Sequence, residues 1–175
     1  ATCRSRAVRR RYILQRINDR VFADIPRLMH NIERVTAHVR GKLRAAGETA
    51  LDRRVLQLVR THADGAFHVD AAGGYWRVYI FIEGASTWDA AHSTDQAAAA
   101  GRAFGRFQAR LADLPPPRLH ETIADFHHTP RRLAALEQAV AADAHNRAAA
   151  VAGEIAFVRE RAGIVDRLVA AHAAG

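Results

Sequence analysis

The sequence predicts an α+β protein in which a small antiparallel sheet and one long helix are followed by a helical region. Two observations lead to this prediction. Runs rich in β-branched and aromatic residues occupy the first half of the chain, and two of them flank a Gly-Gly turn. Ala-rich segments with helical start signals occupy the second half. Because strands and helices do not alternate, a doubly wound parallel sheet is disfavoured.

The first predicted elements are a strand and a long helix. Residues 12–17 (YILQRI) are rich in strand formers and predict the strand. Asp24 followed by Pro26 is typical of a helix start, with Asp24 as the cap. Apolar residues then recur at helical spacing and give this helix one apolar face, formed by Leu28, Ile32, Val35, Val39 and Leu43.

A second strand and a hairpin complete the predicted sheet. Residues 55–60 (VLQLVR) predict the second strand. Residues 67–70 and 75–82 are two further strand-forming runs, and the Gly-Gly pair at positions 73 and 74 lies between them. Two such runs around a short glycine-containing turn predict a β-hairpin.

The second half of the chain predicts helices only. Ser93 and Gln96 form a capping-box pattern that opens a helix ending near Leu114, before three consecutive prolines. Small residues line one face of this helix, and we expect them to let a neighbouring backbone approach closely: Ala97, Gly101, Gly105 and Ala109. Thr129 is predicted to cap a helix with Pro130 at its first position. Two more helices are expected near residues 144–161 and 163–173.

The net charge of +8 is concentrated in the first third of the chain. Of the 26 basic residues 25 are Arg, and residues 1–60 carry a net charge of +10 whereas the remainder carries −2. The basic segment at residues 1–11 could bind nucleic acid, but a solvated terminus is the favoured interpretation. The single cysteine, Cys3, excludes an internal disulfide and a multi-Cys zinc site. We expect a cytoplasmic protein without a membrane span, because no apolar run reaches about 18 residues.

Five segments carry a resemblance to a known family, in the right order and at sensible spacing: residues 12–18, 28–36, 75–84, 101–108 and 119–127. They resemble the N-acetylhexosamine 1-kinase-like group of the aminoglycoside phosphotransferase and choline kinase superfamily. The resemblance covers most of residues 12–175 and implies a protein-kinase-like fold. It divides the chain into the basic segment, an N-lobe-like sheet plus helix at residues 12–83, and the helical start of a C-lobe at residues 84–175.

The resemblance also implies a function, namely ATP-dependent phosphoryl transfer with magnesium to a hydroxyl group of a small sugar or amino sugar. N-acetylhexosamine is the favoured acceptor, ahead of an aminoglycoside or a choline-like molecule. The alternative is a non-catalytic module that binds a nucleotide or a nucleic acid, although nucleic acid is the less favoured partner.

The catalytic motifs of this superfamily are absent from the sequence. An H-x-D-x-x-x-x-N stretch would carry the catalytic Asp and a metal-binding Asn, and a later D-x-D would bind metal. His62 and Asp64 fit the start of the first motif, but position 69 is Val; His68 and Asp70 fit it too, but position 75 is Tyr. No D-x-D occurs. We therefore assign no catalytic residue and no metal ligand, and we expect an incomplete or inactive portion whose partner is a missing C-lobe or another chain.

Candidate nucleotide-binding residues follow from the resemblance. Gln15 stands where many kinases carry the strand lysine that steadies the α- and β-phosphates, and the neighbouring Arg16 points to the opposite face of the strand. Glu33 would be the partner of a phosphate-contacting cation; an ordinary sheet residue and a solvated helix charge are the alternatives for these two positions. The hinge that the resemblance implies would bind adenine through its backbone and comprises Tyr79, Phe81, Ile82 and Glu83.

Overall fold

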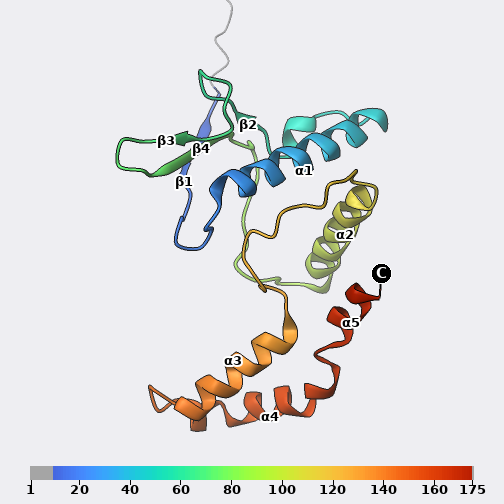
Figure 1. Ribbon diagram of the computed structural model, residues 1–175. Coiled ribbons are helices and arrows are strands. Elements are labelled where there is room, and N and C mark those ends of the chain that lie inside the picture. The colour runs from blue at the N-terminus through green and yellow to red at the C-terminus, as the bar shows by residue number, and fades with distance from the viewer. Residues whose placement is uncertain (1–9, 175) are drawn as a thin grey trace, which may run out of the picture. The chain divides into compact units, whose positions relative to one another are not determined.

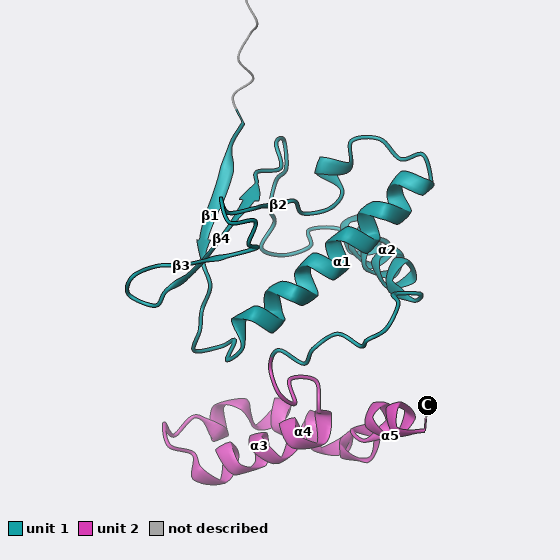
Figure 2. Cartoon of the chain, turned by 45° about the horizontal axis from the view of Figure 1, so that its top comes forward, with its two compact units in different colours: residues 1–122 teal, residues 123–175 magenta. Residues whose placement is uncertain are grey.

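The computed structural model describes residues 10–174 and has the predicted α+β architecture (Figure 1). The Arg-rich run at residues 4–9 and Cys3 lie outside the described residues. The chain divides into two compact units, residues 1–122 and residues 123–175 (Figure 2). The sheet and the first two helices belong to the first unit, so the helix after the sheet packs with the sheet unit.

The sheet has four antiparallel strands, and the central strand β4 pairs with all the others. Their bounds are β1 Tyr12–Arg16, β2 Leu58–Val59, β3 His68–Val69 and β4 Tyr75–Ile80. The strand predicted at residues 55–60 is shorter than expected, since its pairing with β4 is limited to Leu58 and Val59. The predicted hairpin is confirmed, although its strands are also shorter than the sequence runs.

The turn between β3 and β4 needs a glycine at position 73. Gly73 has a φ of +79°, in the left-handed region that glycine adopts without strain. The Asp70 carboxylate accepts hydrogen bonds from the backbone N–H groups of Ala72 (2.9 Å) and Gly74 (2.8 Å) and from Nε1 of Trp76 (2.7 Å). These bonds lower the pKa of Asp70, the Trp76 bond most of all, because they stabilise the ionised form.

Strand β1 forms one border of the sheet, because among the described residues it pairs with β4 alone. The carbonyl of Arg11 accepts from the N–H of Phe81 (3.0 Å), and the N–H of Ile17 donates to the carbonyl of Tyr75 (2.8 Å). Antiparallel pairing alternates along a strand. The odd-numbered residues of β1 therefore bond to β4, and the backbone groups of Tyr12, Leu14 and Arg16 face away from the sheet. All five residues of β1 are exposed.

Helix α1, Ile25–Ala45, covers one face of the sheet and begins as the sequence predicts. The Asp24 carboxylate accepts from the N–H of Arg27 (2.9 Å), which satisfies one of the free donors of the first turn. Met29 is 1% exposed and packs in the main core with Ile17, Ile25 and Ala66. Of the predicted apolar face, Val39 and Leu43 are buried, and Leu28, Ile32 and Val35 are half-buried.

Helix α2, Thr94–Leu111, has the predicted cap but not the predicted packing. Ser93 Oγ accepts from the N–H of Gln96 (3.2 Å), while Gln96 Oε1 accepts from His92, one residue before the cap (2.7 Å). The prediction of a close neighbour along the small-residue face is wrong for the described residues: no atom lies within 4 Å of a Cβ built on Gly101 or Gly105. These glycines face solvent because α2 meets α1 through its C-terminal end.

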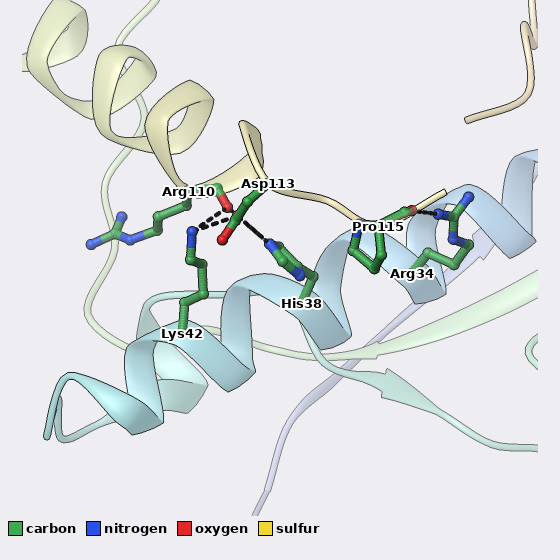
Figure 3. A network of polar contacts seen from close by, with 6 residues as sticks. All are labelled: Arg34, His38, Lys42, Arg110, Asp113 and Pro115. Atoms are coloured by element: carbon green, nitrogen blue, oxygen red, sulfur yellow. Dashed lines mark hydrogen bonds and ion pairs between the residues drawn. The ribbon is translucent and has the colours of Figure 1, made fainter. Parts of the chain in front are cut away.

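Polar contacts join the end of α2 to α1 (Figure 3). Lys42 Nζ lies 2.5 Å from Asp113 Oδ1, and His38 Nε2 lies 3.0 Å from the same oxygen and 3.0 Å from the Arg110 carbonyl. Nε2 faces two acceptors, so it carries the hydrogen. The segment after α2 continues along α1, where Arg34 donates to the Pro115 carbonyl (2.6 Å).

The second unit contains three helices, α3 Thr129–Ala142, α4 Ala152–Glu160 and α5 Arg167–Ala173. The predicted cap at Thr129 is wrong: His128 is the cap, and its Nδ1 accepts from the N–H of Arg131 (3.3 Å). Arg159 donates two hydrogen bonds to the Glu137 carboxylate and joins α4 to α3 (2.9 and 2.6 Å). Among the helices of residues 10–174, none has the length and apolar character needed to cross a membrane.

Candidate functional site

A pocket of about 500 Å³ lies in the first unit between α1, β4 and α2, which is within the size range of small-ligand sites. Its walls are largely apolar, and Arg54 and Arg77 are the charged residues in its lining. The full lining comprises Asn31, Ile32, Val35, Thr36, Val39, Arg54, Val55, Leu56, Arg77, Tyr79 and Phe107. Because this lining contains no Asp or Glu, the pocket has a cationic character.

Arg77 lies on the α1 face of β4, directly opposite Gln15 on the neighbouring strand β1. Its Nε donates to Gln15 Oε1 (2.9 Å), and its Nη1 lies 3.7 Å from the Met29 sulfur. The guanidinium carbon lies 5.1 Å from the centre of the Tyr79 ring, within the range of a cation–π contact. The structure therefore brings two predicted site residues, Gln15 and Tyr79, together around an arginine.

Tyr79 is a buried wall of the pocket, with 6% of its surface exposed. Burial raises the pKa of the Tyr79 hydroxyl, since a phenolate would be poorly solvated there, and the nearby Arg77 opposes this effect. The side chain is therefore neutral at physiological pH and offers an aromatic face and a hydroxyl.

Two of the other predicted hinge residues, Phe81 and Glu83, contact Arg11. The Arg11 guanidinium lies 4.0 Å from the centre of the Phe81 ring and makes two hydrogen bonds to the Glu83 carboxylate, one of them 2.8 Å from Nε to Oε1. The pKa of Glu83 is lowered, chiefly by the hydrogen bond from Arg11. Arg53 donates to the Glu83 carbonyl. Phe81, Ile82 and Glu83 are not in the pocket lining, although Tyr79 at the end of β4 is.

Glu33 lies on α1, but its carboxylate pairs with Arg60 at 2.6 Å rather than with Gln15 or Arg77. Arg60 follows β2 and also lines a second pocket of about 440 Å³ beside the opposite face of the sheet, where Leu14, Val59 and Val78 lie in register. The lining of the second pocket contains Asp70 as well as Arg60 and Arg77, so Arg77 borders both pockets and the second one lacks the one-sided charge of the first.

No described residues fit the magnesium that the superfamily uses. Within residues 10–174 no group of three or more His, Cys, Asp or Glu side chains is placed to hold a metal ion. The sequence also lacks the H-x-D-x-x-x-x-N and D-x-D motifs. The residues present fit the binding of an apolar group next to an anion, and they do not fit metal coordination.

A small antiparallel sheet, one long helix across it and a pocket at the end of its central strand define a kinase-like α+β protein. Residues 2–174 match the model of the phosphotransferase enzyme family. The chain therefore belongs to this family, the aminoglycoside phosphotransferase and choline kinase superfamily, as the resemblance of its segments implied.

The sequence analysis missed Arg77. The hairpin pattern contained the necessary signal, because alternation along residues 75–80 places Tyr75, Arg77 and Tyr79 on one face of the strand. What it lacked was the register between β1 and β4, which sets Gln15 opposite Arg77.

Proposed function

We propose that this chain provides the nucleotide-binding side of an ATP-dependent phosphotransferase that acts on a hydroxyl group of a small molecule. The observation that carries the proposal is membership of the phosphotransferase enzyme family over residues 2–174. The cationic pocket beside β4 supports it, since a nucleotide combines an apolar base with anionic phosphates. ATP, when bound, supplies the phosphoryl group.

The chain's own residues would bind and orient the nucleotide. Ile32, Val35 and Leu56 give the pocket an apolar wall suited to a base. As the resemblance implies, the segment at residues 79–83 would contact the base edge through its remaining backbone groups, since the Phe81 N–H already bonds to Arg11 and the Glu83 carbonyl to Arg53. The Arg11–Glu83 pair holds this segment against the end of β1. Arg77 and Gln15 lie on the α1 face of the sheet, where the Arg77 guanidinium could donate hydrogen bonds to the phosphates.

Nucleotide binding is tested by thermal unfolding of the chain with ATP, with adenosine and with neither. We expect ATP at a hundredfold excess over its Kd to stabilise the chain by about 2.7 kcal/mol. Leu56→Asp, which places a carboxylate in the pocket lining, should abolish the stabilisation, whereas Leu119→Asp outside the pocket should retain it. An unchanged melting curve at millimolar ATP contradicts the proposal.

The acceptor is proposed to be an N-acetylhexosamine-like sugar. With ATP present, N-acetylglucosamine or N-acetylgalactosamine should shift the melting curve further than an aminoglycoside or choline. Because the catalytic motifs are absent from the sequence, we expect no ADP release by this chain alone in a coupled assay. Sugar-dependent ADP release would contradict the inactivity, and a larger shift with choline would contradict the acceptor class.

A further inference from the structure

We propose that Arg77 is the anion-binding residue of this pocket and contacts the phosphates of the ligand, in place of the strand lysine that Gln15 replaces. The inference rests on the proposed function insofar as the ligand is a nucleotide. Its physical basis is a half-buried guanidinium at the wall of a pocket, with no carboxylate to neutralise it.

The first argument is charge. Arg54, the other cation in the lining, is exposed and already paired with Glu48, with Nη2 3.0 Å from Oε2. Arg77 forms no ion pair with any described residue, and its contacts are an amide oxygen, a sulfur and an aromatic ring. A partly desolvated cation without a counterion is stabilised by an anion that enters the pocket.

The second argument is geometry. Gln15 Oε1 accepts from Nε of Arg77, and Nη1 faces the Met29 sulfur at 3.7 Å, a weak contact. Among contacts with residues 10–174, Nη2 makes no hydrogen bond. Gln15 therefore holds one edge of the guanidinium and leaves the terminal nitrogens available for phosphate oxygens, which suit their planar, forked arrangement.

The third argument explains why position 15 carries no charge. A lysine there would place a second cation directly across the strand pair from Arg77, and like charges at such positions repel. A glutamine accepts a hydrogen bond from the guanidinium without neutralising it. Arg16 does not perform this role, because it is opposite Trp76 in the register and lies on the other face of the strand.

The test compares ligand binding by four variants of the full chain, using ATP, adenosine and inorganic tripolyphosphate as probes in isothermal titration without metal. Arg77→Met should weaken ATP and tripolyphosphate about tenfold or more and leave adenosine unchanged. Gln15→Glu should do the same while keeping side-chain size, because the new carboxylate neutralises Arg77. Arg77→Lys should retain part of the binding. Arg16→Met is the control, since it removes one positive charge from the opposite face and should leave all three affinities unchanged.

The outcomes separate this inference from the proposed function. If ATP binds to the wild-type chain but Arg77→Met and Gln15→Glu bind it normally, the role of Arg77 is overturned and nucleotide binding stands. A parallel loss of adenosine and ATP affinity in Arg77→Met would make Arg77 a packing residue and also overturn the inference. If tripolyphosphate binds through Arg77, but ATP binds no more tightly than tripolyphosphate and adenosine does not bind, the anion site is confirmed and the nucleotide assignment fails. No binding of tripolyphosphate or ATP by the wild type overturns both.

Discussion

Asp113 shows how one exposed carboxylate can join the segment that follows α2 to helix α1. It accepts from Lys42 and lies within hydrogen-bond distance of His38, both of which project from α1 (Figure 3). The pKa of Asp113 is lowered, first by the hydrogen bond from Lys42 and then by that from His38. The carboxylate is 62% exposed, so water and salt weaken the pair.

Stability should consequently depend on pH through Asp113. A depressed carboxyl pKa contributes stability that is complete above its unfolded value and is lost as the pH falls through its folded value. Asp113→Asn should therefore lower the urea midpoint at pH 7 and have a smaller effect at the acid end of the transition. Asp89→Asn is the matched control, because Asp89 lies in an exposed loop and makes no ion pair with described residues. An identical deficit for Asp113→Asn at both pH values would contradict the assignment.

Helix α1 is the element that organises the first unit, and one amide on it fixes the segment that follows α2. Asn31 Nδ2 donates to the His120 carbonyl (2.7 Å) and Asn31 Oδ1 accepts from the His120 N–H (2.9 Å). These two bonds satisfy the backbone N–H and carbonyl groups of His120, which belongs to no helix or strand. A segment far away in the sequence is thereby held along α1.

Asn31→Ala should destabilise the chain by about 2 kcal/mol, because two partly buried hydrogen bonds are lost together. Urea unfolding measures this change, and limited proteolysis between residues 112 and 122 should accelerate in parallel. His30→Ala removes only an exposed ring contact with His120 and should stay within about 0.5 kcal/mol of the wild type. Unaltered proteolysis in Asn31→Ala would show that the amide is dispensable.

The sequence was sufficient for elements whose signals are local. Asp24 predicted the start of α1, Ser93 that of α2, and Gly73 the hairpin turn, because each acts on its own backbone within a few residues. The sequence was insufficient where contacts between segments far apart in the chain determine the length of a strand or its register. Pairing with β4 limits the second strand to Leu58 and Val59, and only the β1–β4 register reveals Arg77 beside Gln15.

At the scale of the whole molecule, the two units differ in how much core they contain. Seven of the eight buried apolar residues of the described chain belong to the first unit, and Ile155 of α4 is the buried residue of the second. Local opening costs least where few apolar contacts are lost. The pocket lies entirely in the better-packed unit.

Hydrogen exchange should therefore separate the units. Amides of α1 near Met29 should exchange much more slowly than amides of α4 near Ile155, and mild denaturant should expose residues 123–174 first. Met29→Ala, which creates a cavity and costs about 2–5 kcal/mol, should accelerate exchange in α1 with a smaller effect on α4. Met29→Leu should cost less than about 1.5 kcal/mol. Equal protection of both helices would contradict this difference between the units.

The outward-facing backbone of β1 also has a consequence for how the protein behaves at high concentration. Tyr12, Leu14 and Arg16 present unpaired donors and acceptors in a strand whose side chains are exposed, which is a template for pairing with another copy. Charge opposes that pairing, because antiparallel strands joined through these outward-facing residues would bring Arg16 of one copy close to Arg10 of the other. Such repulsion acts through water and is screened by salt. Solubility should thus fall as ionic strength rises, so that dilute buffer keeps this protein in solution better than the added salt that often helps basic proteins.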